Sequence, residues 1–358
     1  MAPITPQPFL GVGFHGIGAF FAANCYSPQK YIKRWSWEVF WMVQAAFCWF
    51  LWPIVGAWLT IPDLGAVLAE APKDRMLWSF LMGVAYGVGG TAFNVAIRYI
   101  GFSLTYSIAV GLSSVLGTLV PPLVRGQFGD IAAKVGSGWV FGGVAAGALG
   151  IAICGMAGRF KESDLKATAA GAGEFSLTKG LTLSLIAGAL SAVYGFALEV
   201  ATPIADIAEK HGAGYWRGNV TYIFANSGAF LTALAYSLFL ARKNKTLGEL
   251  TRLKEGSEPA SLPVNYLLAI ATGTLWYGQF FFYNLGHVRL GKEYAFSSWA
   301  IHMVMLVLFS NLVAIVFKEW KRCSPRTHSA IGLGLVVLCA AVLLLTYGNY
   351  LGDTSTSH

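Results

Sequence analysis

The sequence predicts an all-α polytopic membrane protein with ten transmembrane helices, arranged as two inverted five-helix repeats. Hydrophobic residues make up 56% of the 358 residues and charged residues only 12%, whereas soluble domains have about 25% charged residues. Apolar runs of about 20 residues recur along the chain, and a helix of that length crosses roughly 30 Å of hydrocarbon. The prediction depends on these runs, on the basic residues between them and on their division into two sets of five.

Each apolar run is bounded by charged or turn-forming residues, which define its ends to within a few positions. The first run has no lysine or arginine before it and is as long as a span, so we expect it to remain as a helix and not to be cleaved as a signal peptide. Tryptophans such as Trp41 and Trp58 lie toward the two ends of the second predicted span, where we expect them at the membrane–water interfaces. The ten predicted spans are 8–28, 37–59, 76–97, 101–121, 138–158, 180–200, 218–240, 264–286, 294–317 and 329–350.

The connections between the spans differ in positive charge. The odd-numbered loops hold 17 lysines and arginines, the even-numbered loops hold 8, and neither tail holds any. Cytoplasmic loops are enriched in these residues. We therefore expect the odd-numbered loops in the cytoplasm and both termini in the periplasm of a bacterial inner membrane. The net charge of +8 is a topology signal and does not predict nucleic-acid binding.

The polar connection 159–179 divides the chain into two transmembrane halves, 1–158 and 180–358, with five spans each. Two related halves with an odd number of spans must have opposite orientations, as in the inverted repeats of many transporters. A shift of 191 residues superposes Tyr86-Gly87 on Tyr277-Gly278, and chance is an equal explanation in so glycine-rich a chain. We predict a cytoplasmic linker between two inverted repeats.

Polar and aromatic residues recur at helical spacing on one face of the predicted span 264–286. They are Trp276, Gln279, Tyr283 and His287. Aromatic rings pack on the C–H faces of sugars, and amides pair with hydroxyl groups. The first three are therefore candidate substrate-binding residues. An aromatic packing seam is the alternative, because three phenylalanines stand at 280–282.

Two histidines are expected at membrane depth, His302 in the ninth span and His15 in the first. A buried ionisable group in a membrane is a functional-site hypothesis, and histidine titrates near neutral pH. Each is a candidate proton carrier, and the sequence does not choose between them. Ser298 and Trp299 share a face with His302 and are candidate ligand contacts. The alternative is a neutral histidine that is hydrogen-bonded between helices.

Further polar residues near or within the spans have both functional and structural interpretations. Glu38 and Glu199 are candidate proton sites near span ends, although Glu38 also suits a helix N-terminus or the neighbouring basic turn. The amides within the predicted spans are candidate substrate contacts, and a structural hydrogen bond between helices is the more common role of such groups. They are Asn94, Gln44 and Asn226.

The chain has no motif of a soluble enzyme. A phosphate loop, an HExxH sequence and a CxxC sequence are all absent, and the five cysteines are scattered without metal-ligand spacing. We expect no catalytic residue, metal or cofactor.

The chain resembles the bacterial L-rhamnose–proton symporter family, within the drug/metabolite transporter superfamily. The resemblance lies in Tyr26-Ser27-Pro28, Lys33-Arg34-Trp35-Ser36-Trp37-Glu38, Arg98-Tyr99-Ile100-Gly101, Trp276-Tyr277, Gln279–Tyr283, Gly286-His287, Ser298-Trp299, His302-Met303 and Lys318-Glu319-Trp320. His15 also falls where that family has a histidine in its first span. This resemblance implies uptake of L-rhamnose, and of L-lyxose, together with a proton. A carrier with another substrate or coupling, or a membrane sugar sensor, is the alternative.

Overall fold

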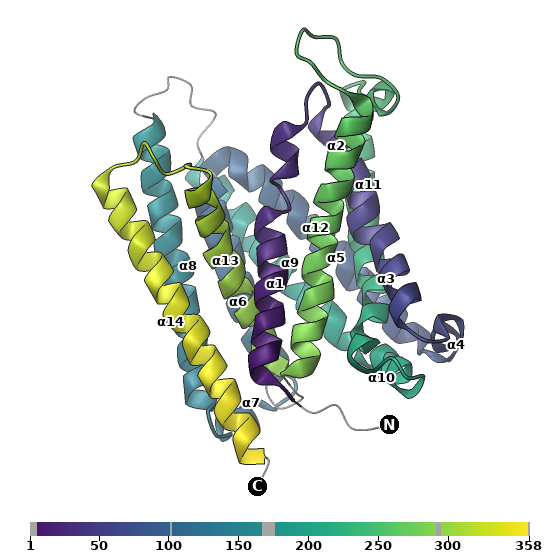
Figure 1. Ribbon diagram of the computed structural model, residues 1–358, viewed down its shortest axis with the longest axis vertical. Coiled ribbons are helices and arrows are strands. Elements are labelled where there is room, and N and C mark those ends of the chain that lie inside the picture. The colour runs from purple at the N-terminus through teal and green to yellow at the C-terminus, as the bar shows by residue number, and fades with distance from the viewer. Residues whose placement is uncertain (1–5, 101, 167–175, 291–294, 357–358) are drawn as a thin grey trace. The chain divides into compact units, whose positions relative to one another are not determined.

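The computed structural model describes residues 6–100, 102–166, 176–290 and 295–356 (Figure 1). Within these ranges the chain is helical and contains no β-strand, so the all-α prediction is confirmed. Prolines stand in the first turn of several helices, including α1 (Pro8–Asn24), α3 (Trp52–Thr60) and α14 (Pro325–Thr356). The first turn tolerates proline because its N–H groups have no partner within the helix.

The chain forms two compact units, and each unit combines segments that are distant in the sequence. Unit 1 consists mainly of Phe21–Val88 and Ala197–Asn284. Unit 2 consists of Ala2–Phe20, Gly89–Phe196 and Leu285–His358. The helices α1, α5 (Lys73–Ile100), α9 (Leu177–Val200) and α12 (Leu262–Arg289) contribute residues to both.

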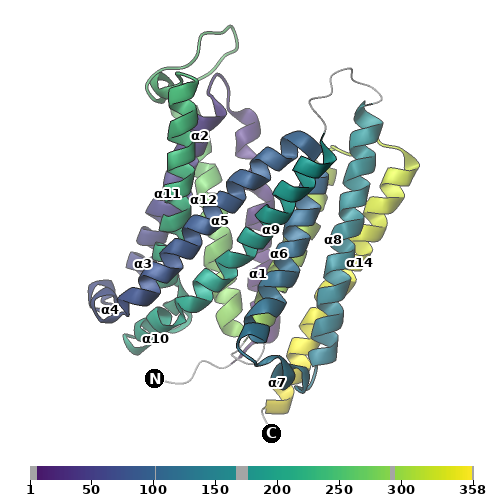
Figure 2. The same cartoon turned by 180° about the vertical axis from the view of Figure 1, so that it is seen from behind.

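Unit 1 packs the second and seventh predicted spans against each other. Its other elements are η1 (Pro28–Tyr31), α2 (Trp37–Ala45), η2 (Ala46–Leu51), α3, α4 (Leu64–Glu70), α10 (Thr202–Lys210), η3 (Gly214–Val220), α11 (Thr221–Lys243) and η4 (Leu247–Leu250). The helix α11 packs on both α2 and the π-helical turn η2. The short helices α4 and α10, visible at one end of this unit in Figures 1 and 2, bury a shared apolar cluster that includes Val67 and Ile204.

Unit 2 is built around the pairing of α8 (Ser137–Lys166) with α14. Its other elements are α6 (Phe102–Val124), α7 (Phe128–Ala132), η5 (Ala295–Ser297) and α13 (Ser298–Val316). The helices α8 and α14 run side by side in both views (Figures 1 and 2). A Cβ added at Gly143 would come within 2.7 Å of Leu345, so glycine is required for this close approach.

Among the described residues, nine helical segments are long and apolar enough to cross a membrane. The predicted span 264–286 forms a helix, α12, but this helix is not one of the nine. Polar residues such as Gln279, Asn284 and His287 reduce its hydropathy. The polytopic class is confirmed, while the tenth span and the two inverted repeats stay predictions.

The linker predicted at 159–179 begins as helix, because α8 continues through residue 166 and α9 begins at Leu177. Residues 167–175 lie outside the described ranges, as do 291–294 of the turn between the eighth and ninth predicted spans. Several short helices, among them α4, α7 and α10, lie in the connections between the predicted spans.

Candidate functional site

Trp276 is the centre of an aromatic cluster in unit 1, in which the three tryptophans are buried and Tyr26 is partly exposed. Its ring centroid lies 5.2 Å from Tyr26, 5.6 Å from Trp41 and 5.2 Å from Trp49, with all three rings edge-on to it. The Trp41 and Trp49 rings also contact each other, at 5.9 Å. The cluster thus brings α12 together with α2, the π-helical turn and the segment that follows α1. We call these four residues the tryptophan cluster.

The π-helical turn Ala46–Leu51 positions one member of this cluster. Proline has no N–H group, so Pro53 cannot donate to the carbonyl group of Trp49 four residues earlier, and the regular helical pattern is interrupted there. Such turns are rare in helices and are frequently found at functional sites. Here the turn contributes Trp49, which is 4% exposed.

Two amide side chains of unit 1 have no hydrogen-bond partner among the residues that the structure describes. Gln44 is fully buried, and neither of its amide atoms is bonded to any described residue. The side chain of Gln279, which is 8% exposed, also makes no hydrogen bond to a described residue. The indole N–H of Trp49 and the hydroxyl group of Tyr277 are likewise buried without a bond to a described residue. Each unsatisfied group costs about 1–3 kcal/mol, so a polar ligand or water molecules are expected to bind here.

The helix α12 approaches α2 closely beside Gln44. A Cβ added at Gly273 would lie 2.7 Å from the carbonyl oxygen of Gln44 and 2.9 Å from Cβ of Phe47. Only glycine permits this separation. The unbonded amide of Gln44 therefore belongs to a helix pair whose backbones are held at short range.

The other predicted amide and aromatic candidates fall into different environments. Tyr283 and Asn226 are buried in unit 1, on α12 and α11. Asn94 belongs to unit 2, and its Nδ2 donates to the carbonyl oxygen of Gly90 at 3.0 Å in the same helix. This bond already occupies one donor of the Asn94 amide.

The two candidate histidines come together in unit 2. His15 on α1 is fully buried, His302 on α13 is 2% exposed, and their ring centroids are 5.9 Å apart. Ser298 lies one turn before His302 on the same face of α13, and its Oγ is 2.9 Å from Nε2 of His15. The three side chains form a buried polar group, which we call the histidine pair with its serine.

A glycine on α12 allows the first span to pass close to the histidine pair. A Cβ added at Gly286 would come within 2.8 Å of Cδ2 of His15 and 2.8 Å of the carbonyl oxygen of Gly11. The next residue, His287, is half-buried. The Gly286-His287 sequence thus brings the end of α12 against the ring of His15.

Trp299, a predicted ligand contact, makes structural contacts in unit 2. Its indole N–H donates to the carbonyl oxygen of Ser113 at 3.0 Å, and its ring lies 6.3 Å from that of Tyr194. The side chain is 6% exposed. Its single donor is therefore already used between α13 and α6.

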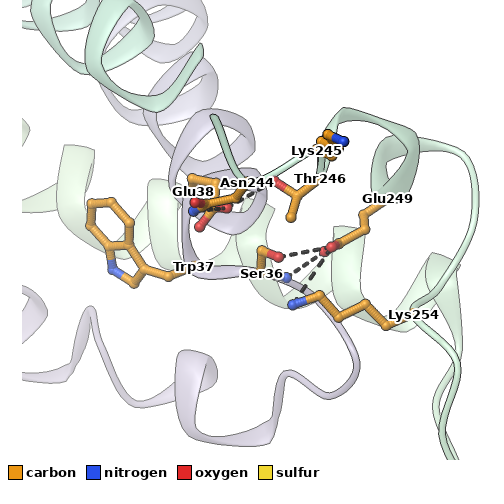
Figure 3. Close-up of a pocket in the computed structure, with 8 residues that line it drawn as sticks. All are labelled: Ser36, Trp37, Glu38, Asn244, Lys245, Thr246, Glu249 and Lys254. Carbon is orange, nitrogen blue, oxygen red and sulfur yellow. Dashed lines mark hydrogen bonds and ion pairs between the residues drawn. The ribbon is translucent and has the colours of Figure 1, made fainter. Parts of the chain in front are cut away.

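Glu38 lines a polar cavity of about 460 Å³ in unit 1 (Figure 3). Its Oε1 accepts hydrogen bonds from Nδ2 of Asn244 at 3.0 Å and from Oγ1 of Thr246 at 2.8 Å. The expected pairing with the basic turn at Lys30–Arg34 is not observed among the described residues. Uncharged donors from the end of α11 hold this carboxylate at the N-terminus of α2, where the helix dipole also favours it.

A second buried carboxylate, Glu249, lies in the same cavity (Figure 3). It accepts hydrogen bonds from the backbone N–H of Ser36 at 2.6 Å and from the Ser36 hydroxyl group at 2.8 Å, and Lys254 lies 3.6 Å away. These bonds tie the loop before α2 to the loop after α11. Glu199, the other carboxylate candidate, is half-buried near the end of α9.

Several residues of these sites were not selected from the sequence. Trp41 was expected in an interfacial belt, but it is buried in the tryptophan cluster, so that expectation is wrong. Its separation from Trp49 by eight residues, about two helical turns, is a signal that could have indicated a shared face. Tyr26 and Glu249 had no such signal. No group of three or more potential metal ligands occurs within the described ranges.

The family model of the L-rhamnose-proton symport protein (RhaT) matches residues 6–350. The chain belongs to this family. The match covers nearly the whole chain and contains every candidate residue described above.

Curated members of the L-rhamnose–proton symport family align along nearly their full length. The L-rhamnose-proton symporter of Mannheimia succiniciproducens is 32% identical over 341 residues, which cover 95% of this chain and 97% of the relative. Those of Cronobacter sakazakii and Pectobacterium atrosepticum are each 33% identical, with the same coverage. Family membership also makes the chain a transporter and not an enzyme.

Proposed function

We propose that this protein carries L-rhamnose into the bacterial cell together with a proton, by alternating access across the inner membrane. Membership of the L-rhamnose–proton symport family supports both the substrate and the coupling. The single observation that supports the sugar site is the pair of buried, unbonded amides, Gln44 and Gln279, in the unit that contains the tryptophan cluster. L-lyxose is a second substrate, since it has the same ring hydroxyl configuration and lacks only the methyl group.

The proposed sugar site combines aromatic faces with amide groups. Trp276 and its neighbours supply apolar ring surface for the C–H groups of the sugar. An amide both donates and accepts, so Gln44 and Gln279 can each bond two hydroxyl groups. Tyr283 and Asn226 are further contacts from the same unit. Binding of the sugar would then supply the partners that these buried groups lack.

The proposed proton site is the histidine pair with its serine. Two imidazolium rings 5.9 Å apart repel each other, so the pair carries one proton at a time. The Ser298 hydroxyl group donates to Nε2 when the His15 ring is neutral and accepts from it when the ring is charged. Glu38 is a weaker candidate because Asn244 and Thr246 already hold its carboxylate. Glu199 stays an alternative.

Coupling requires the proton and the sugar to favour each other's binding by the same factor. Inward movement of one positive charge is driven by about 2.3 kcal/mol per 100 mV of membrane potential. That driving force corresponds to roughly 50-fold accumulation of sugar. The protonated carrier must therefore bind L-rhamnose more tightly than the unprotonated carrier does.

The proposed architecture is two inverted five-span repeats with both termini in the periplasm. Under this pairing, the second span corresponds to the seventh, the fourth to the ninth and the fifth to the tenth. The helices concerned pack together in each case, as α2 with α11, α6 with α13 and α8 with α14. Contact between corresponding helices is what a pseudo-two-fold axis in each unit would produce.

Reconstituted vesicles provide the direct test. L-rhamnose is added outside de-energised vesicles that contain the purified protein, and the external pH is recorded with L-fucose as the control sugar. Symport predicts an alkaline change that is specific to L-rhamnose and L-lyxose. Sugar movement without a pH change would contradict the coupling. Sugar binding without any movement would instead identify a sensor.

The variants His302→Gln and His15→Gln test the proton site. Each should abolish uphill uptake while counterflow, which exchanges labelled for unlabelled sugar without net proton movement, survives. His211→Gln is the matched control, because His211 contacts Glu70 far from the histidine pair in sequence. Normal uphill uptake by both test variants would exclude the histidine pair as the proton site.

A further inference from the structure

A groove of about 370 Å³ lies between α13 and α14 in unit 2. Lys318, Lys321 and His328 line it from the connection between the two helices and from the first turn of α14. Ile315, Ile331 and Leu335 also line it, and the last two lie one and two turns further along α14. We call this the α13–α14 groove. The proposed transport mechanism does not use it.

The indole ring of Trp320 forms part of the groove wall. Trp320 is 6% exposed, and its N–H group is buried without a hydrogen bond to any described residue. The ammonium group of Lys161 lies over the Trp320 ring, 4.7 Å from the ring centroid. An unbonded, buried N–H donor beside positive charge favours an anionic oxygen acceptor.

The two lysines of the groove have no acidic partner among the residues that the structure describes. Within the described ranges, neither Lys318 nor Lys321 forms an ion pair. The acidic residue between them, Glu319, is 3.1 Å from Lys161. His328 donates from Nδ1 to the carbonyl oxygen of Ser324 at 2.9 Å, which leaves Nε2 for a ligand.

The groove lies where both helices leave their apolar segments. The candidate membrane span of α13 ends at Val316, and that of α14 begins at Pro325. We therefore expect the basic side chains at headgroup level, and Ile331 and Leu335 at the depth of the acyl chains. A free phosphate ion would satisfy only the basic part, while a phospholipid would occupy both.

We propose that the α13–α14 groove binds an anionic phospholipid. Lys318 and Lys321 hold its phosphate group, the Trp320 N–H donates to a phosphate oxygen, and an acyl chain lies along Ile331 and Leu335. Basic pockets between transmembrane helices are known sites for such headgroups. The bound lipid would join α13 to α14 at one membrane surface.

Gly332 permits a test that leaves the charges in place. A Cβ added there meets no atom within 4 Å, so a larger side chain can enter the groove without displacing the protein core. Gly332→Leu should therefore block the acyl chain and leave the fold intact. Gly142→Leu on α8 is its matched control, since Gly142 also faces open space.

The experiment is a titration of the detergent-purified full chain with phosphatidylglycerol, phosphatidylcholine or inorganic phosphate, read out by native mass spectrometry and thermal unfolding. The unaltered protein should retain phosphatidylglycerol in preference to phosphatidylcholine. Lys318→Gln with Lys321→Gln should weaken this binding about thirtyfold, since each lysine near an anionic lipid contributes about fivefold. Arg242→Gln with Lys243→Gln at the end of α11 is the charge-matched control.

The outcomes separate the alternatives. Loss of bound phosphatidylglycerol in Gly332→Leu and in the double lysine variant, with both controls unaffected, supports the proposal. Equal retention by the variants and the unaltered protein overturns it. Equal stabilisation by inorganic phosphate also overturns the proposal, because the acyl chain is then not recognised. Equal stabilisation by phosphatidylcholine overturns it too, because the negative charge of the lipid is then not recognised.

Discussion

The hydroxyl oxygen of Ser298 lies 2.9 Å from Nε2 of His15, although 283 positions separate the two residues in the chain. This contact joins the first membrane helix to α13. Because Ser298 precedes His302 by one helical turn, its contact with His15 also holds the His15 ring near the His302 ring. The proton-carrying role proposed for this group can therefore be tested at the serine, without removal of either imidazole.

Ser298→Ala should move the pH of half-maximal L-rhamnose uptake downward by about one unit. A hydrogen bond to a charged ring is stronger than one to a neutral ring, so its loss weakens proton binding by His15 by about tenfold. Uptake across a series of external pH values measures this shift. The control is Ser191→Ala, which removes the 3.0 Å hydroxyl–hydroxyl bond to Ser113 elsewhere in unit 2. An unchanged pH profile would separate Ser298 from coupling.

Gln44→Leu and Gln279→Leu should each weaken L-rhamnose binding by roughly tenfold without lowering thermal stability. A lost hydrogen bond to the sugar costs about 0.5–1.5 kcal/mol, whereas removal of an unbonded buried amide relieves a desolvation penalty. Binding is measured by counterflow and stability by thermal unfolding. Asn265→Leu provides the contrast, because Asn265 bonds to Lys33 and its loss should lower stability alone. Unchanged sugar affinity in both glutamine variants would move the sugar site elsewhere.

Glu38→Gln should keep proton-coupled uptake within about twofold of the unaltered protein. A glutamine oxygen can still accept the bonds from Asn244 and Thr246. Glu249→Leu removes both hydrogen bonds to Ser36 and should lower the free energy of unfolding by about 1–3 kcal/mol. Thermal unfolding and uptake are measured for both. If Glu38→Gln abolished uptake but not counterflow, Glu38 would be the proton carrier.

Alkaline phosphatase fused after residue 358 should be active, because it folds only in the periplasm. Green fluorescent protein fused at the same position should not fluoresce, because it does not fold correctly after export. The expectation follows from the twofold excess of lysine and arginine in the odd-numbered loops. A reporter placed in the loop at residues 254–258, which is predicted to be cytoplasmic, should give the opposite pattern. Matching signals at the two positions would contradict the topology.

The helical class and the approximate span positions followed from hydropathy, because the bilayer requires long apolar helices whose backbone groups bond internally. The predicted span 264–286 is a helix, α12, but it is less apolar than the nine candidate spans, so its crossing of the membrane stays a prediction. Polar residues such as Gln279, Asn284 and His287 lower the hydropathy of α12, and Gln279 is one of the candidate substrate contacts. A hydropathy threshold is therefore least reliable at the helix that contributes most to the proposed site.

The candidate residues were only partly predictable, because helical spacing relates neighbours within one helix and says nothing of partners on another. Trp276 and Gln279 were selected from such spacing, and so was the face shared by Ser298 and His302. That His15 would lie beside His302, or that Tyr26 and Trp41 would surround Trp276, depends on packing between helices. Trp299 was predicted correctly to share a helix with His302, but its hydrogen bond to the carbonyl oxygen of Ser113 on another helix was not predicted.

The interleaved composition of the two units has a consequence for how the protein is made. Membrane helices are inserted one after another and associate afterwards, so α8 is inserted long before α14 has been synthesised. Until then, Gly143 lacks the helix that covers it in the finished protein. Unit 1 likewise waits for α12. A nascent chain halted near residue 158 would therefore hold two unfinished cores, and these would be the surfaces that insertion factors shield or that membrane proteases recognise.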